Sequence, residues 1–391
     1  MPYNYEARLG KLQSYLREQR LDAFLVSTQD SIYYLCGASY KPIERPFFLI
    51  VRPTGAYDLV VPRLEFEHMQ KVQQYGQIRS YFEYPSVEGQ NWFDLLDELL
   101  GKNARVAIEP ECSVDMQSKL TAKEIVISDA ILQLRMLKDA DELEAIRAAA
   151  RWTDLGMKAL HGGIYRGCSV VESVMPARNL QTGVMKSGVY DYLNCSFLTA
   201  AWPAPKSAQP HSVPDFHARM GSGPIVLMSY NRVNGYAAEC ERTVFLDEPS
   251  PRERELFVLV MEARSLALSM VRPGVSCSSI DEATQELFRA RGYGEHILHR
   301  TGHGIGLGNH EQPWISCGGS DILQENMVIS VEPALYFDDI GGFRHSDTVL
   351  VTNNGYELLT RYPDDLEHLI VKRQNWIAAI KGALIRKAIH F

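Results

Sequence analysis

The first third of the chain alternates between helical and strand-like hydrophobic patterns. Residues 5–20 carry leucines at helical spacing, and residues 22–27 form a compact apolar run, which together predict an amphipathic helix followed by a buried strand. Two apolar segments within residues 47–62 flank a turn that contains Pro and Gly, so a β-hairpin is expected. A helix at 92–100 and a strand at 105–110 follow. This alternation predicts an α/β domain on a central sheet, which we place at residues 1–136.

The remaining residues, 137–391, predict a second domain of the α+β class. It opens with a long helix at 137–160 whose first turns are acidic, as the helix dipole favours. Strand-like segments are expected at 224–230, 242–246, 327–335 and 345–352, and helices at 251–272 and 278–292. The tail at 376–391 has helical spacing with interleaved basic residues. It is expected to dock on its own domain or on a second subunit, with a membrane-surface helix as the alternative.

Composition narrows the range of partners. The 391 residues are 46% apolar and 23% charged, with a net charge of −8, which is ordinary for a globular protein. No stripe of Lys and Arg and no base-reading motif is present, so no nucleic-acid partner is expected. No signal peptide and no apolar run of membrane-spanning length is found. The seven cysteines are scattered and never form a CxxC pair, which favours reduced thiols and a cytoplasmic location without membrane contact.

Four short motifs carry the candidate chemistry. They are GYAAECERT at 235–243, GHGIGLGNHEQP at 302–313, SVEP at 330–333 and GGFRHSD at 341–347. In this order and spacing they resemble the pita-bread superfamily of methionine aminopeptidase, prolidase and creatinase. The resemblance implies an α/β domain like the creatinase N-terminal domain, followed by an α+β pita-bread catalytic domain.

The peptidase members of this superfamily hold two metal ions with five ligands, and two of those positions are altered here. Met228 stands where the first Asp is expected, and Ser346 where the last Glu is expected. Hard divalent ions require anionic oxygen donors, which Met and Ser do not supply. Glu239, His303 and Glu332 remain at the other three positions.

Other residues resemble creatinase, a metal-free amidinohydrolase of the same fold. Glu241, in the sequence CERT, matches a catalytic carboxylate of creatinase, and His211 matches its acid/base histidine. Arg45, in ERPFFLIV, matches an arginine that binds the substrate carboxylate. This resemblance implies a homodimer in which the N-terminal domain of one subunit, including Arg45, closes the site of the other.

Further positions depart from the creatinase pattern. Trp314 stands where creatinase has a second arginine, His345 where it has a glutamate, and Ala237 where it has a tyrosine. Candidate substrate-binding residues are therefore expected at Arg45, Glu239, His310, Trp314, Arg344 and His345, and candidate catalytic residues at His211, Glu241, His303 and Glu332.

These residues predict hydrolysis of a non-peptide C–N bond in a small zwitterion, such as an amidine, guanidino compound or cyclic amide, without a metal. His211 can accept a proton from water and then donate it to the leaving nitrogen. The first alternative is an Xaa-Pro aminopeptidase or dipeptidase with one zinc or manganese ion at Glu239, His303 and Glu332, to which His345 can add a fourth ligand. The second alternative is a binding module without catalysis.

Overall fold

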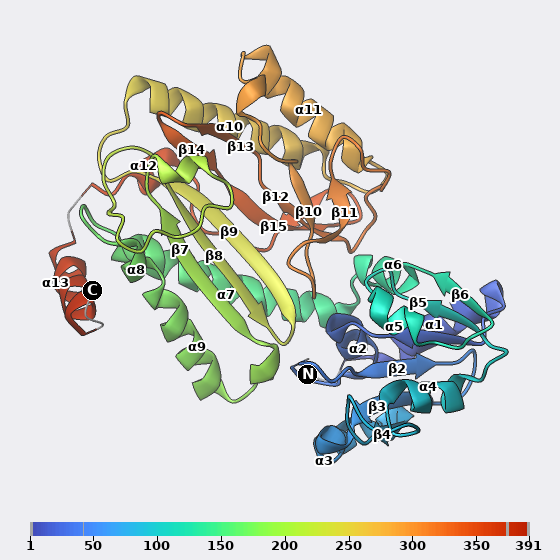
Figure 1. Cartoon of the computed structure of the whole chain (residues 1–391). Helices are drawn as coiled ribbons and strands as arrows, with labels where there is room; N and C mark the ends of the chain where they lie inside the picture. The colour runs from blue at the N-terminus through green and yellow to red at the C-terminus, as the bar shows by residue number, and fades with distance from the viewer. Residues whose placement is uncertain (1–2, 42, 373–374, 389–391) are drawn as a thin grey trace. The chain divides into compact units, whose positions relative to one another are not determined.

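A computed structural model describes residues 3–41, 43–372 and 375–388, and the chain divides into two compact units, 1–135 and 136–391. Each unit is built on its own sheet (Figure 1).

The first unit holds a six-stranded sheet in the order β4-β3-β2-β1-β5-β6. The predicted hairpin is confirmed, because β2 and β3 pair antiparallel, with Phe48 opposite Val60. Trp92 and Phe48 are fully buried and in ring contact at 5.1 Å, so helix α4 closes one face of this sheet. The elements are α1 (Tyr5–Gln19), β1 (Ala23–Val26), α2 (Gln29–Cys36), β2 (Phe48–Val51), β3 (Tyr57–Pro62), α3 (Phe66–Met69), β4 (Gly76–Tyr81), α4 (Trp92–Leu100), β5 (Arg105–Ile108), α5 (Val114–Ser118), β6 (Glu124–Ile127) and α6 (Ala130–Met136).

The second unit is α+β, as predicted. Its main sheet runs β11-β10-β12-β15-β9-β8-β7, with β16 paired to β15, and β13 and β14 form a separate two-stranded sheet. The strands are β7 (Ser196–Trp202), β8 (Ile225–Val233), β9 (Tyr236–Val244), β10 (Gly302–Gly304), β11 (Glu311–Ile315), β12 (Val328–Val331), β13 (Ala334–Phe337), β14 (Gly341–Arg344), β15 (Ser346–Val351) and β16 (Tyr356–Leu358). The helices are α7 (Ala140–Gly163), α8 (Val170–Ser173), α9 (Met175–Ser187), α10 (Pro251–Met270), α11 (Cys277–Ala290), α12 (Leu366–Leu369) and α13 (Trp376–Ala388).

Two pairs of helices pack against this curved sheet (Figure 1). Helix α7 lies along β8 and β9 with α9 beside β7, while α10 and α11 pack on each other and cover strands of the other half. Both long helices begin at capping boxes, Asp139 with Glu142 for α7 and Ser250 with Glu253 for α10. These side chains satisfy backbone N–H groups that have no partner within the helix, so the sequence sets the first residue of each helix.

The predicted strand at 327–335 is wrong, and the difference affects the position of Glu332. The apolar run 327–335 was expected to be a single strand, but it forms β12 in the main sheet and β13 in the small one. Pro333 lacks the N–H that a continuous ladder would need, so the chain changes sheets there. Glu332 therefore lies at the end of β12 beside the break.

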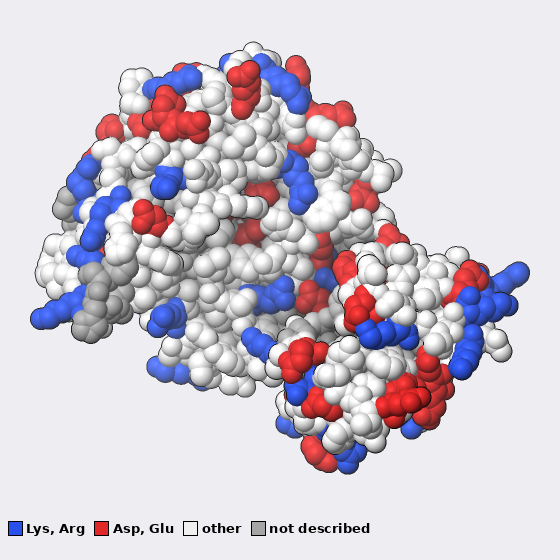
Figure 2. Space-filling view, viewed as in Figure 1, with Lys and Arg blue, Asp and Glu red and all other residues white. Residues whose placement is uncertain are grey.

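The C-terminal helix α13 docks on its own unit. Arg386 donates to Glu172 and Tyr165, and Gly382 passes so close to Glu172 that a Cβ would lie 1.8 Å from its Oε2. Residues 389–391, the end of the predicted tail helix, lie outside the described residues. Within the described ranges, no helix combines the length and apolarity needed to cross a bilayer. Lys and Arg side chains are interspersed with Asp and Glu on the face shown in Figure 2.

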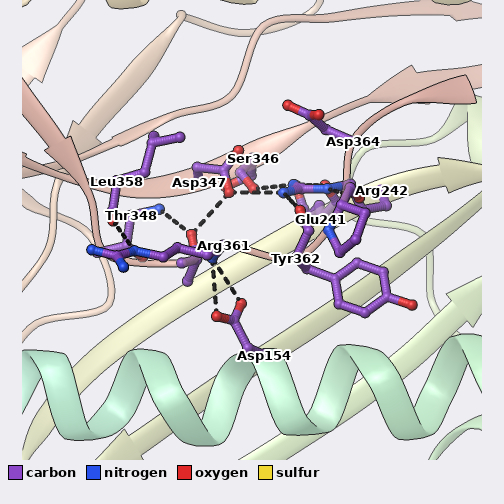
Figure 3. Close-up of polar contacts among 12 residues, drawn as sticks. Asp154, Glu241, Arg242, Ser346, Asp347, Thr348, Leu358, Arg361, Tyr362 and Asp364 are labelled. Atoms are coloured by element: carbon purple, nitrogen blue, oxygen red, sulfur yellow. Dashed lines mark hydrogen bonds and ion pairs between the residues drawn. The ribbon is translucent and has the colours of Figure 1, made fainter. Parts of the chain in front are cut away.

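A buried ion network joins β9, β15 and α10. The carboxylate of Asp347, which is completely buried, accepts from Arg242 at 2.9 Å and from Arg264 at 3.0 Å and 2.5 Å. Thr360 donates a further hydrogen bond to the same carboxylate at 2.9 Å. Figure 3 shows Asp347 facing Arg242, with Arg361 held by Asp154 nearby.

Arg242 also connects this network to the backbone. Its Nη1 donates to the carbonyl oxygens of Glu241 at 2.7 Å and Ser346 at 2.9 Å, and its Nη2 donates to that of Tyr362 at 2.7 Å. One buried guanidinium therefore bridges the two strands that carry Glu239, Glu241 and Ser346. Since both charges are desolvated, each depends on the other for its stability.

We expect Asp347→Leu to lower the free energy of unfolding by about 3–5 kcal/mol, because two buried guanidinium groups would lose their counter-charge. Urea unfolding followed by circular dichroism measures this change. The control is Glu367→Gln, which removes exposed ion pairs with Lys372 and Arg254 and is expected to leave the free energy of unfolding nearly unchanged. Equal losses in the two variants would contradict the role given to Asp347.

Candidate active site

A cavity of about 880 Å³ opens on the second unit. Strands β7, β8, β9 and β14, the segment before β10 and the loop before β8 contribute to its walls. The lining residues are Trp202, Pro210, His211, Ser212, Met228, Glu239, Glu241, Leu298, His299, Arg300, His310, Ser316, Glu332 and Arg344.

Strand register places two carboxylates on the floor of this cavity. Glu239 and Glu241 are two residues apart on β9, so their side chains leave the same face of the sheet. Across β8, Met228 pairs with Glu241 and Tyr230 pairs with Glu239. The thioether of Met228 therefore lies on the floor where the resemblance places a carboxylate.

Two serines hold the carboxylate of Glu239. Ser330 donates to its Oε1, and Ser346 donates to the same oxygen at 3.1 Å. The two hydroxyls are themselves 3.1 Å apart. Ser346 thus stands where the resemblance places the last metal ligand, and its hydroxyl donates to the neighbouring Glu239.

His303 lies between carboxylates and is completely buried. Its Nδ1 donates to the Gly304 carbonyl at 2.9 Å, which leaves Nε2 at 3.3 Å from Glu332 and 3.6 Å from Glu239. Burial lowers the pKa of His303, but the two carboxylates raise it to about 9. Burial likewise raises the pKa of Glu332, and the contact with His303 outweighs it and brings that pKa to about 2. This corner of the cavity therefore stabilises positive charge.

His310 completes this corner. Its ring stacks on that of His303 with centroids 3.9 Å apart, and burial together with the nearby His303 lowers its pKa to about 4. Candidate ligand atoms of Glu239, His303 and His310 lie within 4.8 Å of one another. A neutral imidazole is the form that binds metal ions.

The donor set fits one metal ion and not two. One carboxylate and two imidazoles, with Glu332 next to His303, are a donor set that zinc and manganese accept. The second ion of a dinuclear centre would need the carboxylates that Met228 and Ser346 replace. His303 Nε2 is buried and makes no hydrogen bond among the described residues, and its contacts are the ion pairs with Glu332 and Glu239, so a bound cation would take the place of its proton.

A series of hydrogen bonds connects polar side chains at another part of the cavity, from Glu241 through Arg344 and Tyr336 to His299. Arg344 donates to Glu241 Oε1 at 2.6 Å and to the hydroxyl of Tyr336 at 3.3 Å. The same hydroxyl lies 2.8 Å from Nε2 of His299, whose Nδ1 donates to the Arg300 carbonyl. That second contact makes Nε2 the acceptor, so Tyr336 donates to His299. Glu241 lines the cavity, and its Oε2 is buried with no hydrogen-bond partner among the described residues.

The cavity brings together seven of the ten predicted site residues. His211, Glu239, Glu241, His310, Glu332 and Arg344 line it, and His303 lies directly behind them. Their chemical roles stay predictions.

Three predicted residues lie elsewhere. Arg45, in the first unit, is paired with Glu83 at 2.5 Å and with Glu44. Trp314 does not line the cavity but lies beneath Arg300, whose guanidinium carbon is 4.2 Å from its ring centroid. His345 is excluded from the ligand set, because its buried ring packs at 4.8 Å against Phe257 of α10, away from the lining.

Four further residues of the site were not predicted from the sequence: Trp202, His299 and Arg300, which line the cavity, and Tyr336, which bonds to Arg344 and His299. Only Thr301 separates His299 and Arg300 from the GHGIG motif, and a polar pair just before a buried strand is the signal that points to them. Tyr336 gave no such signal, because it follows the unrecognised break at Pro333.

Comparison with known proteins matches both units. Residues 144–353 match the model of metallopeptidase family M24, and residues 8–137 match the creatinase/prolidase N-terminal domain. A peptidase of Staphylococcus aureus strain USA300 is 31% identical over 366 residues, covering 91% of this chain and 99% of the relative.

Solved structures agree with these matches. The prolidase of Pyrococcus furiosus is 28% identical with a TM-score of 0.77, covering 90% of this chain and 99% of its own. The prolidase of Pyrococcus horikoshii OT3 is 25% identical with a TM-score of 0.79, covering 92% and 99%. The X-Pro aminopeptidase of Thermotoga maritima is 26% identical with a TM-score of 0.73, covering 90% and 99%.

These findings correct the leading functional prediction. A metal-free, creatinase-like hydrolase of a non-peptide C–N bond was expected from Glu241 and His211, but the similar proteins are peptidases and prolidases. The cluster of Glu239, His303 and His310 also fits a metal ion. The prediction was wrong because the likeness to creatinase is local to the CERT segment, whereas the similarity to peptidases and prolidases extends along nearly the whole chain.

The family model covers more than half of the chain and the S. aureus relative aligns along nearly all of it, so the protein belongs to metallopeptidase family M24, as a hydrolase of the peptidase type.

Proposed function

We propose that this protein is a single-metal peptidase that hydrolyses the bond between an amino-terminal residue and proline in short peptides. The observation that carries the proposal is the cluster of Glu239, His303 and His310 at the floor of the cavity, with Glu332 3.3 Å from His303. The similarity to prolidases and to an X-Pro aminopeptidase, at 25–28% identity, supports the bond type.

Glu239, His303 and His310 would hold the ion, with Glu332 beside them. A bound divalent ion supplies Lewis acidity to a scissile carbonyl and activates water. The two serines fix Glu239 in place, so the ligand does not have to reorganise when the ion binds.

The protein's own residues supply the remaining steps. Glu332 can accept a proton from the attacking water, since its carboxylate lies at the cavity wall. His211, on the loop before β8, can donate a proton to the proline nitrogen as the peptide bond breaks. Glu241 Oε2 can accept a hydrogen bond from the substrate ammonium, because Arg344 occupies only Oε1.

A homodimer with Arg45 near the site of the partner also belongs to this proposal. Its support is the likeness of the first unit to the creatinase/prolidase N-terminal domain.

We expect the purified protein to bind about one manganese or zinc ion per chain after incubation and desalting, because the donor set fits one ion. Elemental analysis measures the content. His303→Ala should lose the ion, whereas His68→Ala, a histidine of the first unit, should keep it. The Met228→Asp, Ser346→Glu double variant should raise the content toward two ions, because it restores both carboxylates. A content near zero in the unmodified protein would refute the single-metal site.

We expect the metal-loaded protein to hydrolyse alanyl-proline faster than alanyl-alanine, with free proline as product measured by chromatography. His211→Ala should lower kcat by about 10²- to 10⁴-fold, the usual contribution of a positioned acid or base. His68→Ala again serves as control. Absence of proline release from a series of Xaa-Pro peptides, at full metal content, would contradict the proposed function.

A further inference from the structure

Arg300 differs from the other arginines at the centre of the second unit. Arg242, Arg264 and Arg344 each pair with a carboxylate of the protein. Arg300 lines the cavity, and no carboxylate among the described residues lies within ion-pair distance of its guanidinium. A positive group in a substrate cavity without an internal partner is available to an anionic ligand.

Trp314 holds this guanidinium in place. The guanidinium carbon of Arg300 lies 4.2 Å from the centroid of the Trp314 ring. Trp314 is on β11, paired to His303 of β10, and Arg300 lies three residues before His303 on the adjoining segment. Trp314, which supports the guanidinium, is therefore held by the strand that carries the candidate metal ligand His303. Such a contact orients the cation while its N–H groups stay free to donate.

The surroundings of Arg300 favour an anion. Burial lowers its pKa, with Glu332 and Asp281 acting in the opposite direction from a distance. A partly desolvated guanidinium gains more from a carboxylate than an exposed one does, because less water competes. Arg344 is less suited to this role, since both of its Nη groups already donate to Glu241, Tyr336 and the Pro210 carbonyl, and its Nε, which has no partner among the described residues, is buried.

A dipeptide presents opposite charges at its two ends. Glu241 Oε2, without a partner on the floor, suits the ammonium, and Arg300 suits the carboxylate. In a tripeptide the carboxylate moves on by one residue, about 3.5 Å along the chain, and a neutral amide meets Arg300 instead. The site then loses a charge-assisted contact without gaining another.

We propose that Arg300, supported by Trp314, binds the C-terminal carboxylate of the substrate and so makes this protein a dipeptidase rather than an aminopeptidase acting on longer chains. This inference rests on the proposed function. It assigns a specificity-determining role to Arg300, which lies outside the four motifs. Arg300 stacks on Trp314, the residue that stands where the creatinase pattern has its second arginine.

The test compares three substrates of the metal-loaded full chain: alanyl-proline, its C-terminal amide and alanyl-prolyl-alanine. We expect kcat/KM for the free acid to exceed that of the amide and of the tripeptide. Arg300→Met should lower kcat/KM for the free acid by about 10- to 100-fold, the range of a hydrogen bond to a charged group, and leave the amide nearly unchanged. Arg300→Lys, which keeps the charge, should retain part of the preference. Arg272→Met, which removes an exposed charge elsewhere, should leave all three values unchanged.

Equal loss for acid and amide in Arg300→Met, or an unmodified protein that does not distinguish them, would overturn the inference while leaving the peptidase in place. If no peptide is cleaved, the proposed function fails. The affinities of the intact dipeptide and of its amide, measured by calorimetry, then test whether Arg300 binds the carboxylate. Acid-selective binding that disappears in Arg300→Met would then support the carboxylate site, and equal binding of the two would refute it. Should Arg300→Met fold poorly, Arg300→Lys and the acid-to-amide ratio of the unmodified protein give the same decision.

Discussion

The buried carboxylate of Asp347 determines where the strands of the catalytic unit can lie. It is the counter-charge of Arg242 and Arg264, and Arg242 in turn donates to backbone carbonyls of both β9 and β15. Neither guanidinium can leave its position without stranding a charge in a medium of low polarity. The register of the two strands, and with it the spacing of the side chains on the cavity floor, follows from this constraint.

That register explains how the cavity retains a compact ligand cluster after two ligand positions have changed. Ser346 stays opposite Glu241 on the neighbouring strand, where its hydroxyl reaches Glu239. A carboxylate at the same place would repel Glu239 unless a cation separated the two groups. The Ser346 hydroxyl can therefore bond to Glu239 whether or not an ion is bound. A serine at this position, however, offers the ion one anionic oxygen fewer than a glutamate would.

Short, distinctive motifs made much of the fold predictable. The acidic first turns at 137–160, the helix-like pattern at 251–272, the Pro- and Gly-containing turn and the four motifs predicted α7, α10, the β2–β3 hairpin and the grouping of Glu239, His303 and Glu332. The burial of His345 and the break at Pro333 were not predictable, because both depend on which sheet a strand joins, a tertiary choice that local pattern does not encode. The contact between Arg300 and Trp314 joins segments fourteen positions apart and depends on the pairing of β10 with β11.

The replacement of a carboxylate by Met228 also introduces a group that can be oxidised. A thioether on the cavity wall is accessible to peroxide, and a redox-active ion bound nearby would produce oxidants beside it. The resulting sulfoxide carries a polar oxygen, a harder donor than sulfur, at the position where the resemblance to the peptidases predicts an aspartate. Oxidative damage at this residue would thus change the metal preference of the cavity, and methionine sulfoxide reductases would restore it.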